Sequence, residues 1–282
     1  IKLKWENSPA EMLYDPQPKF IKFALGENVK QANHYRPSKR YPQTRMGVEQ
    51  LILDRFSQAK KYASAKKIKS RRTDLSMEAL AEILEGTRHI TCHSYIQSEV
   101  NMLLNLADSI GFKINTFTHI LEGYKVADKL ALHGAGASTF SDWWAYKYEV
   151  KEAIPYNASL MQKAGVLTAI NSDDGEMGRR LNHEAAKAIK YGDISEEDAW
   201  NMVTINPARL LHIDDRVGSI SIGKDADLVL WSGHPLSVYS KAEKTYIEGV
   251  CYYDTEEDKY LQEYIKSEKS RIIQKILGKK KK

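Results

Sequence analysis

The sequence reads Ala-Ile-Asn-Ser-Asp-Asp-Gly over residues 169–175, where an apolar run that begins at residue 164 ends in small and acidic side chains. The run predicts a short buried strand. A carboxylate just beyond such a strand lies where enzymes built from alternating parallel strands and helices hold their chemistry. Asp173 is therefore a candidate metal ligand or base, whereas we expect Asp174 to belong to the loop.

Two further apolar runs upstream end in histidine. One reads Ile-Thr-Cys-His and ends at His93, and the other reads Phe-Lys-Ile-Asn-Thr-Phe-Thr-His and ends at His119. A helical pattern follows each of them. Two imidazoles and one carboxylate, each at the end of a strand, can converge on a single metal ion.

The bulk composition bounds the class of protein. With 282 residues the chain can bury a large core and hold one barrel-sized domain with a small appendage. Its net charge of +5 comes largely from basic runs at residues 66–72 and 279–282. We interpret both as solvated, and expect no nucleic-acid partner, because no aromatic residues interleave with them. Two cysteines make no disulfide framework. No apolar stretch reaches the ~20 residues of a membrane span, so we expect a soluble protein, cytoplasmic or exported.

The chain divides into four parts by pattern. Residues 1–19 are polar and punctuated by proline, which predicts an irregular N-terminal segment. Residues 20–213 alternate short strands with helices of ~10–15 residues, which indicates parallel α/β architecture. Residues 214–255 switch to short β segments with glycine and proline turns and predict a small β domain. Residues 256–282 form a charged C-terminal helix and tail.

Two downstream runs carry a resemblance to a known family. Residues 204–211 read Thr-Ile-Asn-Pro-Ala-Arg-Leu-Leu, and residues 217–231 read Val-Gly-Ser-Ile-Ser-Ile-Gly-Lys-Asp-Ala-Asp-Leu-Val-Leu-Trp. With the order strand-His, strand-His, strand-Asp, they resemble the metal-dependent amidohydrolase superfamily, in its imidazolonepropionase- and prolidase-like members, over roughly residues 20–253. The resemblance implies an incomplete (β/α)8 TIM-like barrel, represented by its strands four to eight, followed by a small β-sandwich-type appendage.

The family's ligand set maps onto this sequence in part. His93 matches the histidine of the fifth strand, His119 that of the sixth and Asp173 the aspartate of the eighth. Lys22 resembles the carboxylated lysine of the fourth strand, since an unmodified lysine pointing into a barrel is costly to bury. Glu27 is the alternative ligand there. The resemblance implies one or two divalent ions, with Zn²⁺ expected.

One part of the family pattern is missing. The family carries a His-x-His on its first strand, and no His-x-His occurs in this chain. Strands one to three also have no room before Phe20. We therefore expect these strands and the His-x-His on a companion polypeptide or an N-terminal segment, and we expect a homo-oligomer.

The resemblance implies a metal-dependent hydrolase of C–N bonds acting on a small molecule: an amide, a dipeptide or a cyclic amide. In such a site Asp173 would activate water, and His119 would help to polarise the scissile carbonyl. A heterocycle deaminase on the same fold and a non-catalytic barrel serving as a scaffold or binding module remain alternatives. We expect residues 29–44 and 138–157 to shape the pocket. Candidate substrate contacts are His133, placed after the seventh strand, and Arg45, Tyr146, Lys147 and Tyr156.

Overall fold

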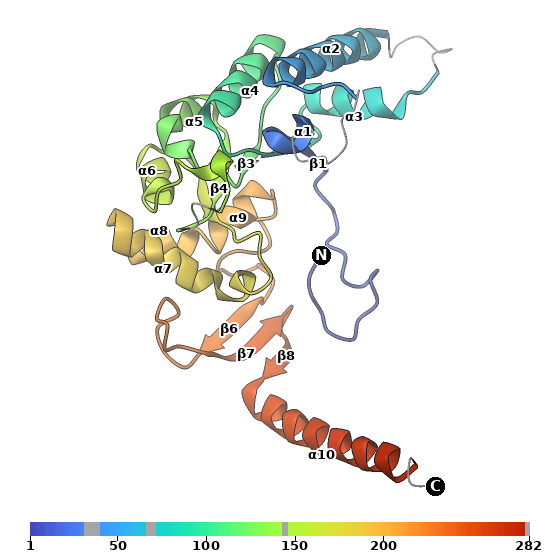
Figure 1. The fold of residues 1–282 in the computed structure, drawn as a ribbon, viewed down its shortest axis with the longest axis vertical. Helices are drawn as coiled ribbons and strands as arrows, with labels where there is room; N and C mark the ends of the chain where they lie inside the picture. The colour runs from blue at the N-terminus through green and yellow to red at the C-terminus, as the bar shows by residue number, and fades with distance from the viewer. Residues whose placement is uncertain (31–39, 66–71, 143–145, 280–282) are drawn as a thin grey trace. The chain divides into compact units, whose positions relative to one another are not determined.

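Two sheets of different kinds organise the chain in the computed structural model, which describes residues 1–30, 40–65, 72–142 and 146–279 (Figure 1). The larger compact unit is Gln17–Ser219, and the smaller one joins Ile1–Pro16 to Ile220–Lys282. Most of both basic runs, and residues 31–39 of the expected pocket loop, lie outside the described residues. Within the described parts no helix is both long and apolar enough to cross a membrane.

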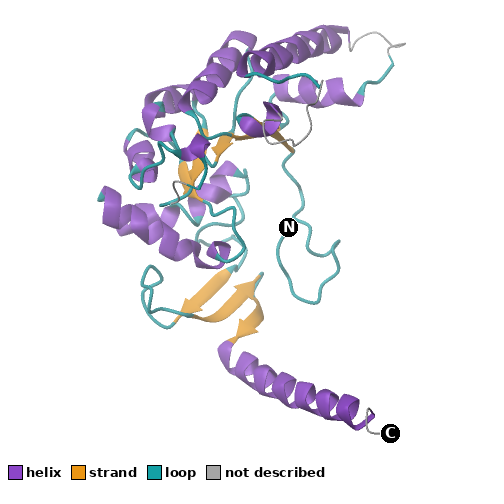
Figure 2. Ribbon diagram, in the orientation of Figure 1, coloured by secondary structure: helices purple, strands orange, loops and turns teal. Residues whose placement is uncertain are grey.

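A parallel sheet of five strands forms the centre of the larger unit, with the strands in sequence order. Parallel neighbours need a crossover connection, and helices supply most of these connections (Figure 2). This confirms the predicted parallel α/β architecture, although the sheet does not close into a barrel within the described residues. The strands are β1 (Phe20–Ala24), β2 (His89–His93), β3 (Thr116–Thr118), β4 (Gly136–Thr139) and β5 (Thr168–Ile170).

Helices begin and end where the local sequence indicates. The Thr44 side chain accepts a hydrogen bond from the Gly47 amide, and Asp74 caps the next helix in the same way. Gly111 ends another helix with a φ of 89°. The helices of this unit are α1 (Glu27–Lys30), α2 (Arg45–Ser64), α3 (Leu75–Leu84), α4 (Gln97–Ile110), α5 (Ala127–His133), α6 (Asn157–Lys163), α7 (Leu181–Gly192), α8 (Glu196–Asn201) and α9 (Ile205–Leu210), with 3-10 turns η2 (Gly123–Lys125), η3 (Tyr148–Val150) and η4 (Met177–Arg180).

The register of the sheet separates a helix-facing side from an inner side. Phe23 of β1 is aligned, through Cys92 of β2, with the buried Phe117 of β3. The Phe23 ring lies 6.2 Å from that of Phe56 on α2, so this face packs against the helices. Because side chains alternate along a strand, Lys22 and its partner Thr91 point to the other side of the sheet, as do Ala24 and its partner His93.

The structure corrects the prediction around the seventh strand. His133 does not follow a strand: it is the last residue of α5, and β4 begins only after it. Gly134, with a φ of 81°, ends the helix. Three of the four residues of this strand, Gly136, Ala137 and Ser138, are small, and only Thr139 has high β propensity. A Cβ at Gly136 would collide with the end of the Leu210 side chain of α9, so a larger residue there would have to displace that leucine.

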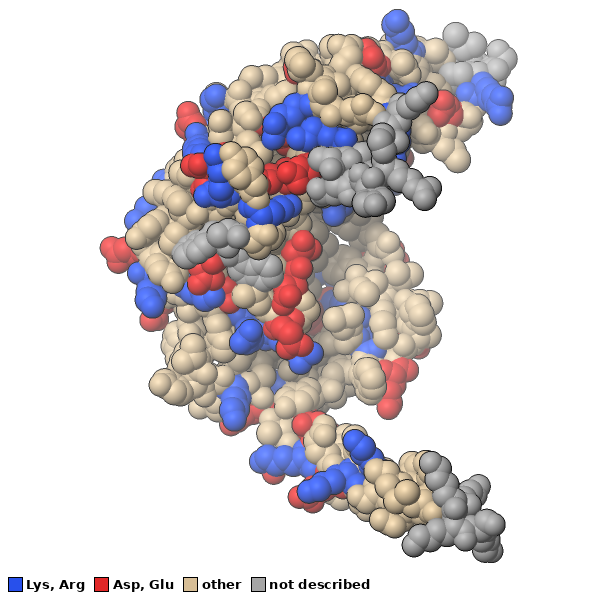
Figure 3. All heavy atoms as spheres, in the orientation of Figure 1, with Lys and Arg blue, Asp and Glu red and all other residues tan. Residues whose placement is uncertain are grey.

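The smaller unit contains an antiparallel sheet of β6 (Leu228–Trp231), β7 (Ala242–Ile247) and β8 (Val250–Asp254), followed by α10 (Thr255–Lys279). Within the predicted β character of residues 217–231, only Leu228–Trp231 forms a strand, and residues 217–227 are turns and irregular segments. In the described residues the appendage is a single three-stranded sheet rather than the expected sandwich, and a helix follows it as predicted. Glu248 and Gly249, with φ of 53° and 81°, form the turn between β7 and β8. On the face seen in Figure 3, Lys and Arg are scattered among acidic side chains rather than gathered in one basic patch.

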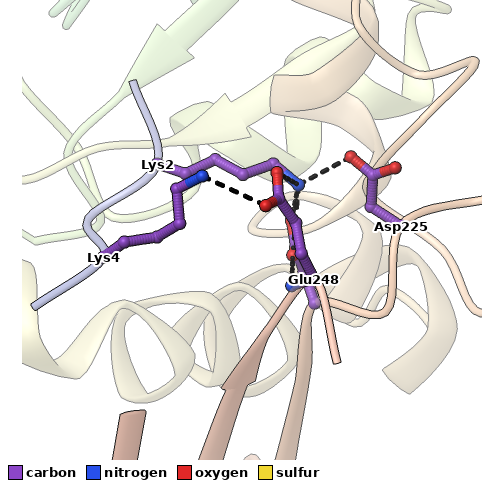
Figure 4. Close-up of polar contacts among 5 residues, drawn as sticks. Lys2, Lys4, Asp225 and Glu248 are labelled. Atoms are coloured by element: carbon purple, nitrogen blue, oxygen red, sulfur yellow. Dashed lines mark hydrogen bonds and ion pairs between the residues drawn. The ribbon is translucent and has the colours of Figure 1, made fainter. Parts of the chain in front are cut away.

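Residues 1–16 lack regular secondary structure and are tied to this β unit by lysines (Figure 4). The Lys2 ammonium group lies 2.6 Å from Asp225 and 3.0 Å from Asp227, and Lys4 lies 3.1 Å from Glu248. The side chain of Lys2 is only 9% exposed. These contacts hold the N-terminal segment against the residues that precede β6 and against the turn between β7 and β8.

Candidate metal centre

The candidate ligands gather at one edge of the parallel sheet. His93 ends β2, His119 follows β3 by one residue, and Asp173 follows β5 by three. The imidazole centroids of His93 and His119 lie 5.3 Å apart, and His119 Nε2 lies 3.9 Å from Asp173 Oδ2. The structure thus brings together the three side chains that the sequence predicts, while their binding of a metal stays a prediction.

Two of these residues hold an unusual backbone conformation. His119 and Asp173 have φ of 58° and 52°, in the left-handed region that side chains other than glycine rarely adopt. Such conformations persist only where the surroundings impose them, and they cluster at functional sites. Backbone hydrogen bonds from Ser94 to Thr118 and from Ile120 to Ser138 hold the chain on both sides of His119.

Both imidazoles are kept neutral at pH 7. Burial, together with the nearby His119, Lys22 and Lys147, lowers the pKa of His93 to about 4. Burial also lowers the pKa of His119, against the opposing effect of Asp173. A neutral imidazole has the free lone pair that a metal ion requires.

Two asparagines that the sequence analysis missed contact the histidines. Asn171 Nδ2 lies 2.8 Å from His119 Nδ1, and Asn28 Nδ2 lies 3.2 Å from His93 Nε2. The Asn171 side-chain oxygen is buried and has no hydrogen-bond partner within the described chain. An outer partner of this kind fixes the ring orientation of a histidine that binds metal. The only signal in the sequence was the place of Asn171 directly after a strand.

Lys22 and Glu27 are placed differently. Lys22 lies on the inner side of β1, and its charge is close enough to lower the pKa of both His93 and His119. Glu27 lies beyond the strand in α1, where its backbone amide donates to Glu149. The contact from α1 to His93 is made by the neighbouring Asn28. Position and register therefore favour Lys22 over Glu27.

A second cluster borders the histidines from the long segment after β4. The Lys147 ammonium group lies 4.2 Å from the centroid of the Tyr95 ring, which in turn meets the His93 ring edge-on at 4.7 Å. Lys147 also pairs with Glu149 at 3.2 Å. Burial, together with a hydrogen bond to Tyr95, raises the pKa of Tyr146. Lys147 and Tyr146 thus both contact Tyr95, beside His93, while their role as substrate contacts stays a prediction. The buried Glu149 was missed.

His133 is the clearest correction among the predicted substrate contacts. Its Nε2 accepts from the Ile114 amide at 3.1 Å, and its Nδ1 lies 2.8 Å from Asp108. Ile114 precedes β3, so His133 lies at the edge of the sheet opposite to the candidate ligands. Its Nε2 thus joins the end of α5 to the segment before β3, and its Nδ1 joins it to α4.

Arg45 and Tyr156 have other partners. Arg45 donates to Glu99, a buried residue in the first turn of α4. The Tyr156 ring lies 6.4 Å from the Tyr191 ring of α7 and is about half exposed. Neither side chain is brought to the histidines by these contacts, so their role as substrate contacts stays a prediction.

A cavity of about 370 Å³ lies between β1 and α2, and its lining includes Asn28, which contacts His93. Phe23, Val29, Ile52 and Phe56 contribute to its lining. It is on the helix-facing side of β1 and contains none of the candidate ligands. Cavity volume by itself therefore does not locate the chemistry.

The donor set suits zinc in kind, because two imidazoles and a carboxylate are ligands that zinc prefers. In the part of the chain that the structure describes, no three His, Cys, Asp or Glu side chains stand close enough together to hold a metal ion outright. His93, His119 and Asp173 would thus need side-chain movements before all three could bind one ion.

Comparisons with known proteins show similarity to amidohydrolases. The model of the Amidohydrolase family matches residues 156–275. The solved structure of an amidohydrolase from Thermotoga maritima MSB8 is 33% identical, with a TM-score of 0.76, over 86% of this chain and 64% of that one. Amidohydrolase tasK of Hapsidospora irregularis is 28% identical over 270 residues, 88% of this chain but 27% of its own length. Imidazolonepropionase of Picrophilus torridus is 39% identical over 71 residues, which make up 25% of this chain and 18% of that protein.

This chain therefore spans about a quarter of the length of one relative and less than two thirds of another. These matches indicate the same family as the strand-end histidines, the aspartate and the sheet topology do. The chain belongs to the amidohydrolase superfamily.

Proposed function

We propose that this chain carries part of the active site of a metal-dependent hydrolase of C–N bonds, acting on an amide, a dipeptide or a cyclic amide. The observation that supports this most directly is the convergence of His93, His119 and Asp173 at one edge of a parallel sheet. Membership of the amidohydrolase superfamily supports the same reaction class.

We further propose that β1 to β5 are strands four to eight of a (β/α)8 barrel. The similarity to the Thermotoga maritima amidohydrolase supports this assignment. The companion polypeptide or N-terminal segment that we expect to carry strands one to three stays a prediction, as does the homo-oligomer.

Zn²⁺ would be held by His93, His119 and Asp173, with Lys22 as a further ligand after carbamoylation and Glu27 as the alternative. When bound, the metal supplies Lewis-acid polarisation of a carbonyl and lowers the pKa of coordinated water to about 7. The carbamate would turn the Lys22 cation into an anion, which removes one of the charges that now lower the pKa of both histidines.

In this proposal Asp173 would move the proton. Its side chain is 61% exposed, so water and substrate can reach it, yet it remains 3.9 Å from His119. It would accept a proton from the attacking water as the oxygen bonds to the carbonyl carbon. It would then return that proton to the nitrogen as the C–N bond breaks.

Lys147 and Tyr146 would face the substrate. Because Glu149 and the Tyr95 ring fix the Lys147 ammonium group beside His93, it can neutralise negative charge on a bound substrate. Tyr146 can donate a hydrogen bond from its hydroxyl, which stays protonated because its pKa is raised.

The test uses the protein as the cell makes it. We expect about one to two equivalents of bound zinc and hydrolysis of at least one class in a panel of N-acyl amino acids, dipeptides and cyclic amides. Asp173→Asn should lower kcat/KM by about 10²–10⁴-fold, and His119→Asn should also lower the zinc content. His234→Asn, an exposed histidine of the smaller unit, is the matched control and should change neither.

Other outcomes separate the alternatives. Release of ammonia from heteroaromatic amines without amide hydrolysis would indicate a deaminase. Stoichiometric ligand binding with no turnover of any substrate would favour a scaffold. Wild-type zinc content and activity in both variants would refute the proposed site.

A further inference from the structure

The C-terminal helix α10 is long and contacts its own unit mainly at its first turn. Its 25 residues span about 37 Å. At its start the Thr255 hydroxyl donates to the carbonyls of Ala242 and Glu243 on β7. From there the helix extends away from β8 (Figure 1). Most of its length therefore lacks a packing partner among the described residues of its unit.

An apolar stripe runs along this exposed helix. Leu261, Ile265, Ile272 and Ile276 are 51%, 53%, 48% and 53% exposed. Since each residue turns the helix by about 100°, these four positions fall within about 60° of one another. Scattered exposed leucines and isoleucines are ordinary on a protein surface, but an aligned row on one helix face marks an interaction site. Uncharged side chains show between the charged ones along this helix in Figure 3.

The stripe is symmetric about its own midpoint. Leu261 and Ile276 are equally far from the point between residues 268 and 269, and so are Ile265 and Ile272. If two copies of the helix lie antiparallel about that point, Leu261 of one faces Ile276 of the other, and Ile265 faces Ile272. A twofold interface requires this reciprocity, in which residue i meets residue j and j meets i.

The charges of α10 favour the same direction. Over residues 255–267 four carboxylates stand against two lysines, whereas over residues 268–279 four basic residues stand against one glutamate. The Glu256–Lys259 and Glu268–Arg271 pairs within the helix remove one charge of each sign from each half and leave this polarity unchanged. Antiparallel pairing sets the acidic half beside the basic half, whereas parallel pairing would set like charges together.

We infer that α10 pairs antiparallel with α10 of a second copy of this chain, centred between residues 268 and 269. The interface is self-complementary in both its apolar stripe and its charge. It does not depend on the proposed metal centre, which lies in the other unit.

Sedimentation of the intact protein over a range of concentrations tests the pairing. For the 282-residue chain we expect the mass to approach twice 32.2 kDa as concentration rises. Ile265→Lys places two like charges in the stripe and should shift the dissociation constant by at least about tenfold. Leu277→Lys, a similarly exposed apolar residue on another face, should leave the constant within about twofold, and circular dichroism should show equal helix content in both variants. A monomer at all concentrations, or a dimer that Ile265→Lys leaves unchanged, would overturn the inference.

Cysteine cross-linking tests the direction. In a background where the exposed Cys251 is serine, Leu261→Cys protein and Ile276→Cys protein are mixed and oxidised. Antiparallel pairing predicts mixed cross-links between the two proteins and none within either. In that arrangement the two copies of residue 261 lie 15 residues apart along the pair, which is about 22 Å and too far for a disulfide. Cross-links between two Leu261→Cys chains would instead show a parallel pair.

Discussion

Replacing Asn157 with alanine should destabilise the larger unit strongly, because one buried amide joins three segments beside the candidate site. The residue is 1% exposed. Its Nδ2 donates to the Ile120 carbonyl at 2.7 Å and to the Thr139 hydroxyl at 2.8 Å, and its Oδ1 accepts from the Tyr124 amide at 2.8 Å. Ile120 follows His119 directly. In Asn157→Ala the carbonyl of Ile120 and the amide of Tyr124 lose their side-chain partner, whereas the Thr139 hydroxyl keeps a contact with Phe140.

The magnitude follows from those two groups. Each buried polar group left without a partner costs about 1–3 kcal/mol, so we expect the free energy of unfolding to fall by about 4 kcal/mol. Urea unfolding followed by circular dichroism measures this loss. With a slope of about 2.5 kcal/mol/M, the midpoint should drop by about 1.5 M. Asn101→Ala, whose amide accepts from an exposed lysine, is the matched control and should stay within about 0.5 kcal/mol. A drop of less than about 0.5 M for Asn157→Ala would refute the reasoning.

Three further outcomes are expected. Metal-free protein should lose stability as pH falls from the ordinary histidine pKa of about 6.5 toward about 4, because in this range the unfolded chain binds a proton that the buried His93 of the folded chain does not bind. In His93→Asn the urea midpoint should depend less on pH across this window, and an equal pH dependence in both proteins would contradict the assignment. Gly26→Ala should lower the melting temperature more than Gly86→Ala, because both glycines have positive φ but only at Gly26 would a Cβ collide with another side chain, that of Glu149. An equal fall in melting temperature in the two variants would show that Glu149 moves aside without cost. Lys2→Met should speed proteolysis of residues 1–16, since their ion pairs with the β unit are weakened, and unchanged cleavage would show that other contacts hold the segment.

The sequence alone determined where the candidate ligands gather. Apolar runs that end at His93, at His119 and shortly before Asp173 predict three strand ends. Helical patterns between them predict parallel strands, whose ends share one edge of the sheet. The starts of α2 and α3 were equally open to prediction, because a capping side chain contacts an amide only two or three residues away.

Only the tertiary structure decided the parts that depend on distant contacts. Alternation shows that Lys22 and Phe23 face opposite sides, but the packing of Phe23 on α2 decides which side is the inner one. Strand β4 is too rich in small residues to be recognised by pattern, and His133 was misplaced as a consequence. The contacts that surround the candidate ligands join residues far apart in the chain, as between Asn171 and His119 or between Glu149 and the Glu27 amide. The local sequence pattern does not predict such partners, because they come into contact only when the strands have paired and the segment after β4 has packed beside them.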